Sequence, residues 1–101
     1  MIAEWLDEYG RPDANLATLL CDRHDADAVA FRFVDAETTA TMTYGELADR
    51  SRRLATALAA HGVRRGDRVA VLMSKRAELV VTLLAIWRLG AVHVPLFTAF
   101  A

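Results

Sequence analysis

A strand–helix–strand pattern in the last third of the chain is the feature that most constrains its fold. Residues 68–73 are a nearly continuous apolar run, as expected for a strand covered on both faces. A helix that is apolar almost all round follows, from residue 74 or 75 to residue 89, and residues 91–94 form a second strand, stopped by Pro95. Two strands joined in this way need a crossover connection, which is right-handed in nearly all known proteins. The pattern therefore predicts an α/β fold with a parallel βαβ core.

The first half of the chain predicts helices and a hairpin that flank this core. Apolar residues recur at helical spacing over residues 1–10 and again over residues 15–24, which predicts two short N-terminal helices. Residues 28–34 alternate and are rich in strand formers, and residues 39–43 are rich in threonine. We expect these two runs to form a small antiparallel hairpin, although no Asn-Gly or Asp-Gly sequence fixes its turn.

The clearest helix signal lies between the hairpin and the βαβ pattern. Thr43 is followed three residues later by Glu46, the spacing of a capping box, and Gly62 is suited to the left-handed cap at the helix end. Between them, Asp49 and Arg53 stand four residues apart in the favourable order for an ion pair. These signals predict a long helix that packs across the βαβ core.

Composition excludes several classes of protein. The chain has 101 residues, a net charge of -1 and one cysteine, Cys21. A near-neutral chain has no general attraction for nucleic acid or acidic membranes, so neither is an expected partner. A single cysteine allows no internal disulfide, the N-terminus lacks a secretory signal, and the apolar stretch over residues 79–87 is too short to span a bilayer. We expect a cytoplasmic protein with no membrane span.

Three segments resemble the opening motifs of the AMP-forming adenylating enzymes, which include the acyl-CoA synthetases. The sequence MTYGEL at residues 42–47 is similar to the family's (Thr/Ser)-Tyr-x-Glu-Leu at the start of a helix. GVRRGDRVA at residues 62–70 matches Gly-Val-x-x-Gly-Asp-x-Val-Ala, and LAIWRLGAVHVPL at residues 84–96 resembles Leu-x-x-x-(Lys/Arg)-x-Gly-Ala-x-x-Val-Pro-Leu. Three motifs in order and at natural spacing make the resemblance specific. It runs from about residue 27 to the end, which implies a single partial domain: N-terminal helices over residues 1–26, then the start of an AMP-binding domain over residues 27–101.

The resemblance implies a parent reaction but no catalytic residue in this chain. Members of the family use ATP and Mg²⁺ to activate a carboxylic acid as an acyl-adenylate and pass the acyl group to a thiol such as CoA. That chemistry needs a Gly/Ser/Thr-rich phosphate loop, an acidic metal ligand and a mobile lysine, and none of these matches this sequence. We therefore expect the incomplete N-terminal part of the large lobe of an acyl-CoA synthetase, inactive alone, with no bound cofactor and no metal site.

The same resemblance implies a ligand contact in only one segment of the chain. Residues 97–100 look more like the acyl-CoA synthetase branch than the peptide-synthetase branch, and in that branch the loop borders the CoA site. Phe97, Thr98 and Ala99 are therefore the candidate CoA neighbours. The competing interpretation is that the two phenylalanines of this loop pack beneath a further helix.

The sequence context of the other potentially reactive residues favours structural roles for them. A triad of Asp67, Ser74 and His93 lacks a nucleophile elbow, and we expect Ser74 to cap the helix that follows it. His24, His61 and Cys21 have no metal-ligand spacing. The arginines that cluster around the long helix and the following turn are interleaved with acids, which favours a salt-bridged surface over a phosphate or nucleic-acid site; they are Arg50, Arg52, Arg53, Arg64, Arg65 and Arg68.

Two alternatives to the enzyme segment stay open. The runner-up to the enzyme segment is a non-catalytic remnant or a standalone interaction module that docks on a full-length partner. A small nucleotide-binding domain is disfavoured because no glycine-rich turn follows any strand. The expected partners are the remainder of the adenylating domain or a full-length homologue, with self-association through an exposed sheet edge as a further possibility.

Overall fold

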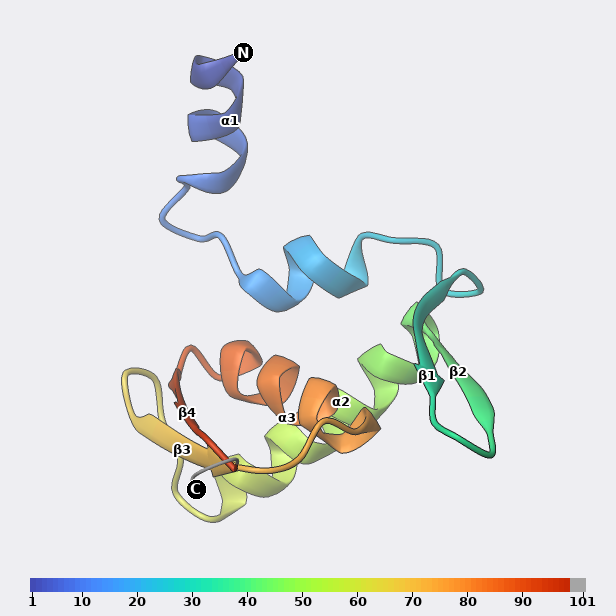
Figure 1. The fold of residues 1–101 in the computed structure, drawn as a ribbon. Helices are drawn as coiled ribbons and strands as arrows, with labels where there is room; N and C mark the ends of the chain where they lie inside the picture. The colour runs from blue at the N-terminus through green and yellow to red at the C-terminus, as the bar shows by residue number, and fades with distance from the viewer. Residues whose placement is uncertain (99–101) are drawn as a thin grey trace.

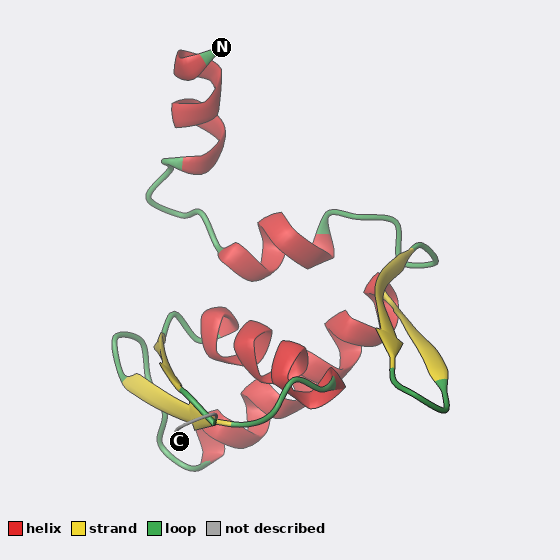
Figure 2. Ribbon diagram, in the orientation of Figure 1, coloured by secondary structure: helices red, strands yellow, loops and turns green. Residues whose placement is uncertain are grey.

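The computed structural model describes residues 1–98 and shows the α/β fold that the sequence predicts (Figures 1 and 2). A parallel pair of strands and an antiparallel hairpin lie at opposite ends of a pair of long helices, and a short N-terminal helix stands apart from the rest (Figure 1). Among these residues, no helix is both long and apolar enough to cross a bilayer. The elements in chain order are α1 (Ile2–Tyr9), η1 (Thr18–Asp22), β1 (Val29–Val34), β2 (Thr39–Thr43), α2 (Tyr44–Ala60), β3 (Arg68–Leu72), α3 (Ala77–Arg88) and β4 (Val92–Leu96).

The predicted βαβ unit is present, with two differences at its ends. Strands β3 and β4 pair in parallel, with Arg68 opposite Val92 and Leu72 opposite Leu96. Pro95 does not stop β4: it pairs with Val71, and the strand continues for one residue more. Among the described residues β4 pairs with β3 alone. A proline is tolerated on such an open edge, because its missing N–H costs no ladder hydrogen bond there.

Helix α3 begins later than the sequence indicates, and Ser74 does not cap it. Its N-cap residue is Arg76, whose side chain makes no capping hydrogen bond. Ser74 lies three residues before the first helical residue, Ala77, which is too far for its hydroxyl to reach the N–H groups of the first turn. The capping prediction for Ser74 is therefore wrong.

Helix α2 begins and ends where the sequence predicts. The hydroxyl of Thr43 accepts a hydrogen bond from the N–H of Glu46 at 3.1 Å, the first half of the capping box. At the other end His61 is the C-cap residue, and Gly62 has a φ of +99°, a conformation that other residues rarely adopt. The cap fixes the junction between the hairpin and the helix, and the glycine turns the chain toward β3.

The hairpin turn is held by a side chain instead of a glycine. Strands β1 and β2 are antiparallel, and the carboxylate of Asp35 accepts hydrogen bonds from the N–H groups of Glu37 and Thr38 at 2.8 and 2.7 Å. This arrangement is an Asx-type turn, in which the aspartate side chain mimics a backbone turn. It explains how the hairpin closes without an Asn-Gly or Asp-Gly pair.

Helix α1 contributes nothing to the core. None of its residues is buried, and Trp5 and Leu6 are 54% and 67% exposed. The radius of gyration is 15.1 Å, against about 13 Å expected for a compact domain of 100 residues. The excess agrees with Figure 1, where α1 projects away from the other elements.

Most of the buried apolar residues form two clusters on either side of α3. One joins η1, β2, α2 and α3, and consists of Ala17, Cys21, Met42, Leu47, Ala48, Val81 and Leu84. The other lies between α3 and the parallel strands, and consists of Val71, Ile86 and Ala91. Helix α3 is therefore the element that both parts of the core share, which accounts for its almost uniformly apolar sequence.

The contrast between the core and α1 gives a direct test of this arrangement. Leu47 is 1% exposed, so Leu47→Ala is expected to lower the free energy of unfolding by about 2–5 kcal/mol, through lost burial and the cavity left behind. Leu6→Ala removes the same atoms from the exposed helix α1 and is expected to change the free energy of unfolding little. Urea unfolding followed by circular dichroism measures both, and equal losses would contradict the described packing.

Candidate functional site

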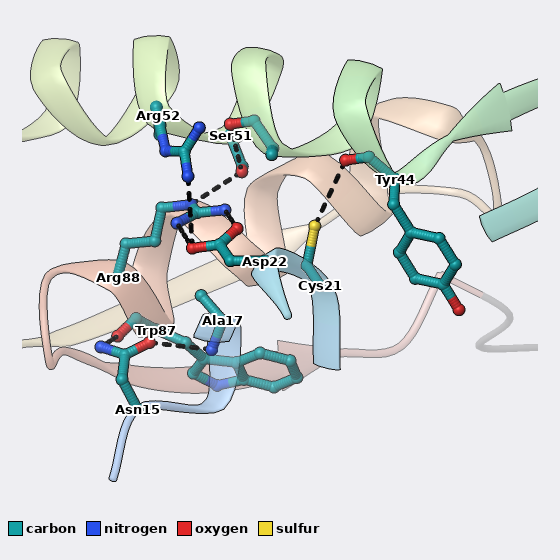
Figure 3. Close-up of polar contacts among 10 residues, drawn as sticks. Asn15, Ala17, Cys21, Asp22, Tyr44, Ser51, Arg52, Trp87 and Arg88 are labelled. Carbon is teal, nitrogen blue, oxygen red and sulfur yellow. Dashed lines mark hydrogen bonds and ion pairs between the residues drawn. The ribbon is translucent and has the colours of Figure 1, made fainter. Parts of the chain in front are cut away.

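A partly buried ion pair joins the N-terminal segment to the end of α3. The guanidinium of Arg88 donates two parallel hydrogen bonds to the carboxylate of Asp22, from Nη2 to Oδ1 at 2.6 Å and from Nη1 to Oδ2 at 2.7 Å (Figure 3). Its Nε donates a third bond to the hydroxyl of Ser51 at 2.8 Å. The side chains of Arg88 and Asp22 are only 12% and 19% exposed, so solvent screens the pair weakly. Charge-assisted hydrogen bonds of this bidentate kind are about twice as strong as those between neutral groups.

Each partner reaches this point because of where its element ends. Asp22 is the last residue of η1, and Arg88 is the last residue of α3. Ser51 is fully buried on the face of α2 that meets them, and its hydroxyl also donates to the carbonyl of Ala48 at 3.1 Å. Arg52 adds a longer ion-pair contact to Asp22 at 3.5 Å. Three segments far apart in the sequence are thus fixed by a single carboxylate and a single guanidinium.

The side chains of Asn15 and Cys21 also attach this N-terminal segment to the helices. The amide nitrogen of Asn15 donates to the carbonyl of Trp87 at 3.3 Å, and its Oδ1 accepts from the N–H of Ala17 at 2.8 Å (Figure 3). The thiol of Cys21 donates to the carbonyl of Tyr44 at 3.5 Å. Both contacts satisfy groups at the boundary of the core, so the segment is held at its beginning and its end.

The electrostatics of the cluster follow from this geometry. The hydrogen bonds from Arg88 lower the pKa of Asp22, and they outweigh the opposing effect of burial. Burial raises the pKa of the Cys21 thiol, and the neighbouring charge of Asp22 raises it further. Asp22 is therefore ionised and Cys21 protonated at neutral pH. A buried protonated thiol is a poor nucleophile, so the cluster has the chemistry of a structural tie.

The candidate CoA neighbours lie elsewhere, directly after β4. Phe97 is 72% exposed, and Leu72 and Leu96, which pair at the carboxyl ends of their strands, are 66% and 48% exposed. Ligands of open α/β sheets bind outside the carboxyl ends of parallel strands, so Phe97 and Thr98 stand at the edge where a ligand is expected. Ala99 lies outside the described residues.

The structure does not assemble a catalytic triad. Asp67 precedes β3 and Ser74 follows it, so the full length of the strand separates them. The carboxylate of Asp67 accepts a hydrogen bond from the N–H of Arg64 at 2.8 Å within the turn before β3. His93 lies within β4, opposite Val69. Asp67 therefore holds a turn and His93 is part of a strand, while Ser74 takes part neither in a triad nor in the helix cap that its position predicted.

The other singled-out residues also take structural positions. The ring of His24 stacks on Tyr44 with centroids 4.6 Å apart. Arg53 forms an ion pair with Asp49, as Arg52 does with Asp22, which agrees with a salt-bridged surface. Across residues 1–98, no three His, Cys, Asp or Glu side chains gather closely enough to hold a metal ion.

Comparison with known proteins defines the family. The model of the AMP-binding enzyme family matches residues 20–101, most of the chain, and the chain belongs to that family. An acetyl-coenzyme A synthetase of Shewanella sediminis is 42% identical over 92 residues, which cover 86% of this chain and 14% of that protein. Acetyl-coenzyme A synthetase 1 of Candida albicans is 40% identical over 77 residues, which cover 76% of this chain and 11% of that protein.

Solved structures agree with the sequence comparison. The crystal structure of an acyl-CoA synthetase from Brucella canis matches 99% of this chain with a TM-score of 0.89 and 39% identity, and the match covers 19% of that chain. A fatty acyl-adenylate ligase from L. pneumophila, solved with acyl adenylate and pyrophosphate, matches 82% of this chain with a TM-score of 0.76 and 28% identity. The present chain spans 14% of the length of the Shewanella sediminis relative and 11% of that of the Candida albicans relative. It corresponds to the N-terminal part of acyl-CoA synthetases.

Sequence reasoning missed the ion pair of Asp22 with Arg88. One signal was present: Arg88 is the only charged residue after the first turn of an otherwise apolar helix, and a buried arginine needs an acidic partner. The partner lies 66 residues away, and the chain has many other acids. The resemblance placed Arg88 at a motif position without assigning it a role.

The lowered pKa of Asp22 predicts how stability depends on pH. Because the pKa is lower in the folded state, the ion pair contributes fully above about pH 4, the ordinary pKa of aspartate, and its contribution is lost as the pH falls through the folded-state value. Asp22→Asn is expected to lower the free energy of unfolding by about 1.5–3 kcal/mol at pH 7, and the difference from the parent is expected to shrink on acidification. Urea unfolding between pH 7 and pH 3 measures both.

Asp49→Asn is the matched control for this experiment. It removes the same charge from an exposed pair on α2, with Arg53, and is expected to have little effect at pH 7. A gap between the parent and Asp22→Asn that stays constant down to pH 3 would contradict the assignment of the stabilisation to the ionised carboxylate.

Proposed function

We propose that these 101 residues build the N-terminal part of the acyl-activating domain of an AMP-forming acyl-CoA synthetase, and that they have a structural role in it. The observation that carries the proposal is the match to the Brucella canis acyl-CoA synthetase, which includes nearly all of this chain but one fifth of that one. The βαβ unit would provide two neighbouring strands of the larger sheet. The tie between η1 and α3 would fix the N-terminal helices against it.

The parent reaction requires groups that the described residues do not bring together. Attack of a carboxylate on the α-phosphate of ATP needs donors for the phosphates and a bound Mg²⁺ to offset the charge. The five glycines of the chain do not cluster into a phosphate loop, and residues 1–98 hold no acidic cluster for a metal. These residues do not fit ATP and Mg²⁺, so no catalytic step is assigned to them, and the chain alone is proposed to be inactive.

A contact with CoA is proposed for the loop after β4. Support comes from its position at the carboxyl ends of the parallel strands and from the exposed ring of Phe97. Thr98 would add a hydroxyl beside that ring, and Ala99 would follow in sequence. The loop would supply part of a wall, because one aromatic ring and one hydroxyl cannot hold a charged cofactor by themselves.

The partner proposed for this segment is the rest of an adenylating domain, in the same chain or in a full-length homologue. Alternate residues of a strand share a face, so Val92 and Leu96 of β4 lie on one face of the sheet with Leu72 of β3. All three are about half exposed or more, whereas parallel sheets are normally covered on both faces. The same uncovered face supports the alternative function, a non-catalytic module that docks on a full-length partner.

The direct test of the proposed inactivity is ATP–pyrophosphate exchange. The purified 101-residue chain is expected to show only background exchange with acetate through medium-chain acids, because it lacks the groups that bind the phosphates. The acetyl-coenzyme A synthetase of Shewanella sediminis, assayed in parallel with acetate, is the positive control. Acid-dependent exchange by this chain would overturn the structural role.

The uncovered sheet face also predicts self-association of the isolated chain. Sedimentation velocity is expected to show concentration-dependent oligomers, because an apolar face and an open strand edge are exposed. Leu72→Lys is expected to shift the distribution toward monomer. Val34→Lys, at a similarly exposed position on the hairpin, is the control and is expected to leave it unchanged. A parent chain that stays monomeric at high concentration would contradict the prediction.

A further inference from the structure

The segment from Asn15 to Arg23, here called the latch, is attached to the rest of the chain mainly by polar contacts. Its fully buried side chains are those of Ala17 and Cys21, both small, whereas Leu16 and Leu20 are 47% and 52% exposed. The apolar area that holds the latch in place is therefore modest. The remaining attachment is the set of hydrogen bonds that Asn15, Cys21 and Asp22 make to α2 and α3.

The parallel half of the core does not depend on the latch. The cluster between α3 and the strands is formed by Val71, Ile86 and Ala91, with residues of α2, β3 and α3 packed around it. No latch residue belongs to that cluster. Undocking the latch would uncover one side of the α2–α3 pair while leaving the packing against β3 and β4 intact.

The boundaries of the latch are also defined. On its C-terminal side the carbonyls of Ala26 and Ala28 accept hydrogen bonds from the N–H groups of Gly45 and Tyr44, at 2.9 and 3.0 Å, so movement would end near residue 25. On its N-terminal side α1 has no buried residue and is attached to the latch itself, through the pair of Glu8 and Arg23 at 2.5 Å. Helix α1 would therefore move with the latch.

We propose that the latch opens and closes as one unit while α2, α3, β3 and β4 stay folded, and that the ion pair of Asp22 with Arg88 sets the fraction of open molecules. Opening breaks the two hydrogen bonds between Arg88 and Asp22 and leaves the one between Arg88 and Ser51. It also brings the buried thiol of Cys21 into contact with solvent. The proposal concerns a motion of this chain and is independent of the proposed enzyme segment.

Cys21 makes the motion measurable because it is the only cysteine in the chain. Labelling with an excess of Ellman's reagent under native conditions reports how often the thiol is exposed. The expected result is a rate that changes little with low concentrations of urea, because a local opening exposes little surface. A labelling rate that rises with urea as steeply as global unfolding, measured by circular dichroism, would overturn the proposal.

Two variants test the part played by the polar contacts. Asn15→Ala removes the bond to Trp87 without altering the charges around the thiol, and is expected to speed labelling about fivefold. Asp22→Asn is expected to speed it tenfold or more, after correction for the reactivity of the thiol in the urea-unfolded protein. Asp49→Asn is the control with an unchanged rate. If Asp22→Asn does not fold, the proposal is tested by Asn15→Ala and by the urea dependence of the parent. A labelling rate that Asn15→Ala leaves unchanged would overturn it.

Discussion

The carboxylate of Asp22 and the guanidinium of Arg88 form the contact on which the placement of the N-terminal segment depends. Burying either charge alone would cost several kcal/mol, so each is tolerated because the other is present, with Ser51 satisfying the third donor of the arginine. Since the two residues end η1 and α3, the pair fixes the angle at which the N-terminal segment meets the helical layer. Cys21 and Ala17 are buried as a consequence of that docking.

The elements of the fold could be predicted because they follow from local rules. The cap at Thr43, the glycine at residue 62 and the largely apolar helix before residue 89 each act over a few neighbouring residues, and the structure contains all three features. The errors are also local. Ser74 lies too early in the sequence to cap α3. Strand β4 continues through Pro95 because no hydrogen bond is required from its backbone nitrogen at an open strand edge.

The tertiary contacts could not be predicted in the same way. An acid and a base 66 residues apart have no spacing that links them, and the chain has other acids available to Arg88. The Asx-type turn at Asp35 had a local signal, an aspartate between two strand-like runs, but it is weaker than an Asn-Gly pair. The loop after β4 was selected by family resemblance alone, and its geometry adds a location at the carboxyl ends of the strands.

The packing on the two sides of α3 has different requirements. Toward β3 and β4, the chain has a packed inner face and an uncovered apolar outer face, as expected for part of a larger sheet. Toward η1, a small apolar contact through Ala17 and Cys21 is combined with the ion pair of Asp22 and Arg88. The family relationship explains the uncovered sheet face, since the chain matches a small share of much longer enzymes. The ion pair explains the attachment of η1.

A double-mutant cycle between Asp22 and Arg88 tests this account most directly. Asp22→Asn, Arg88→Gln and the double variant would be compared with the parent by urea unfolding at pH 7. The two losses are expected to overlap, with a coupling energy of at least about 1.5 kcal/mol, because each substitution removes the same bonds. Losses that add to within about 0.5 kcal/mol would show that the two residues act independently and would contradict it.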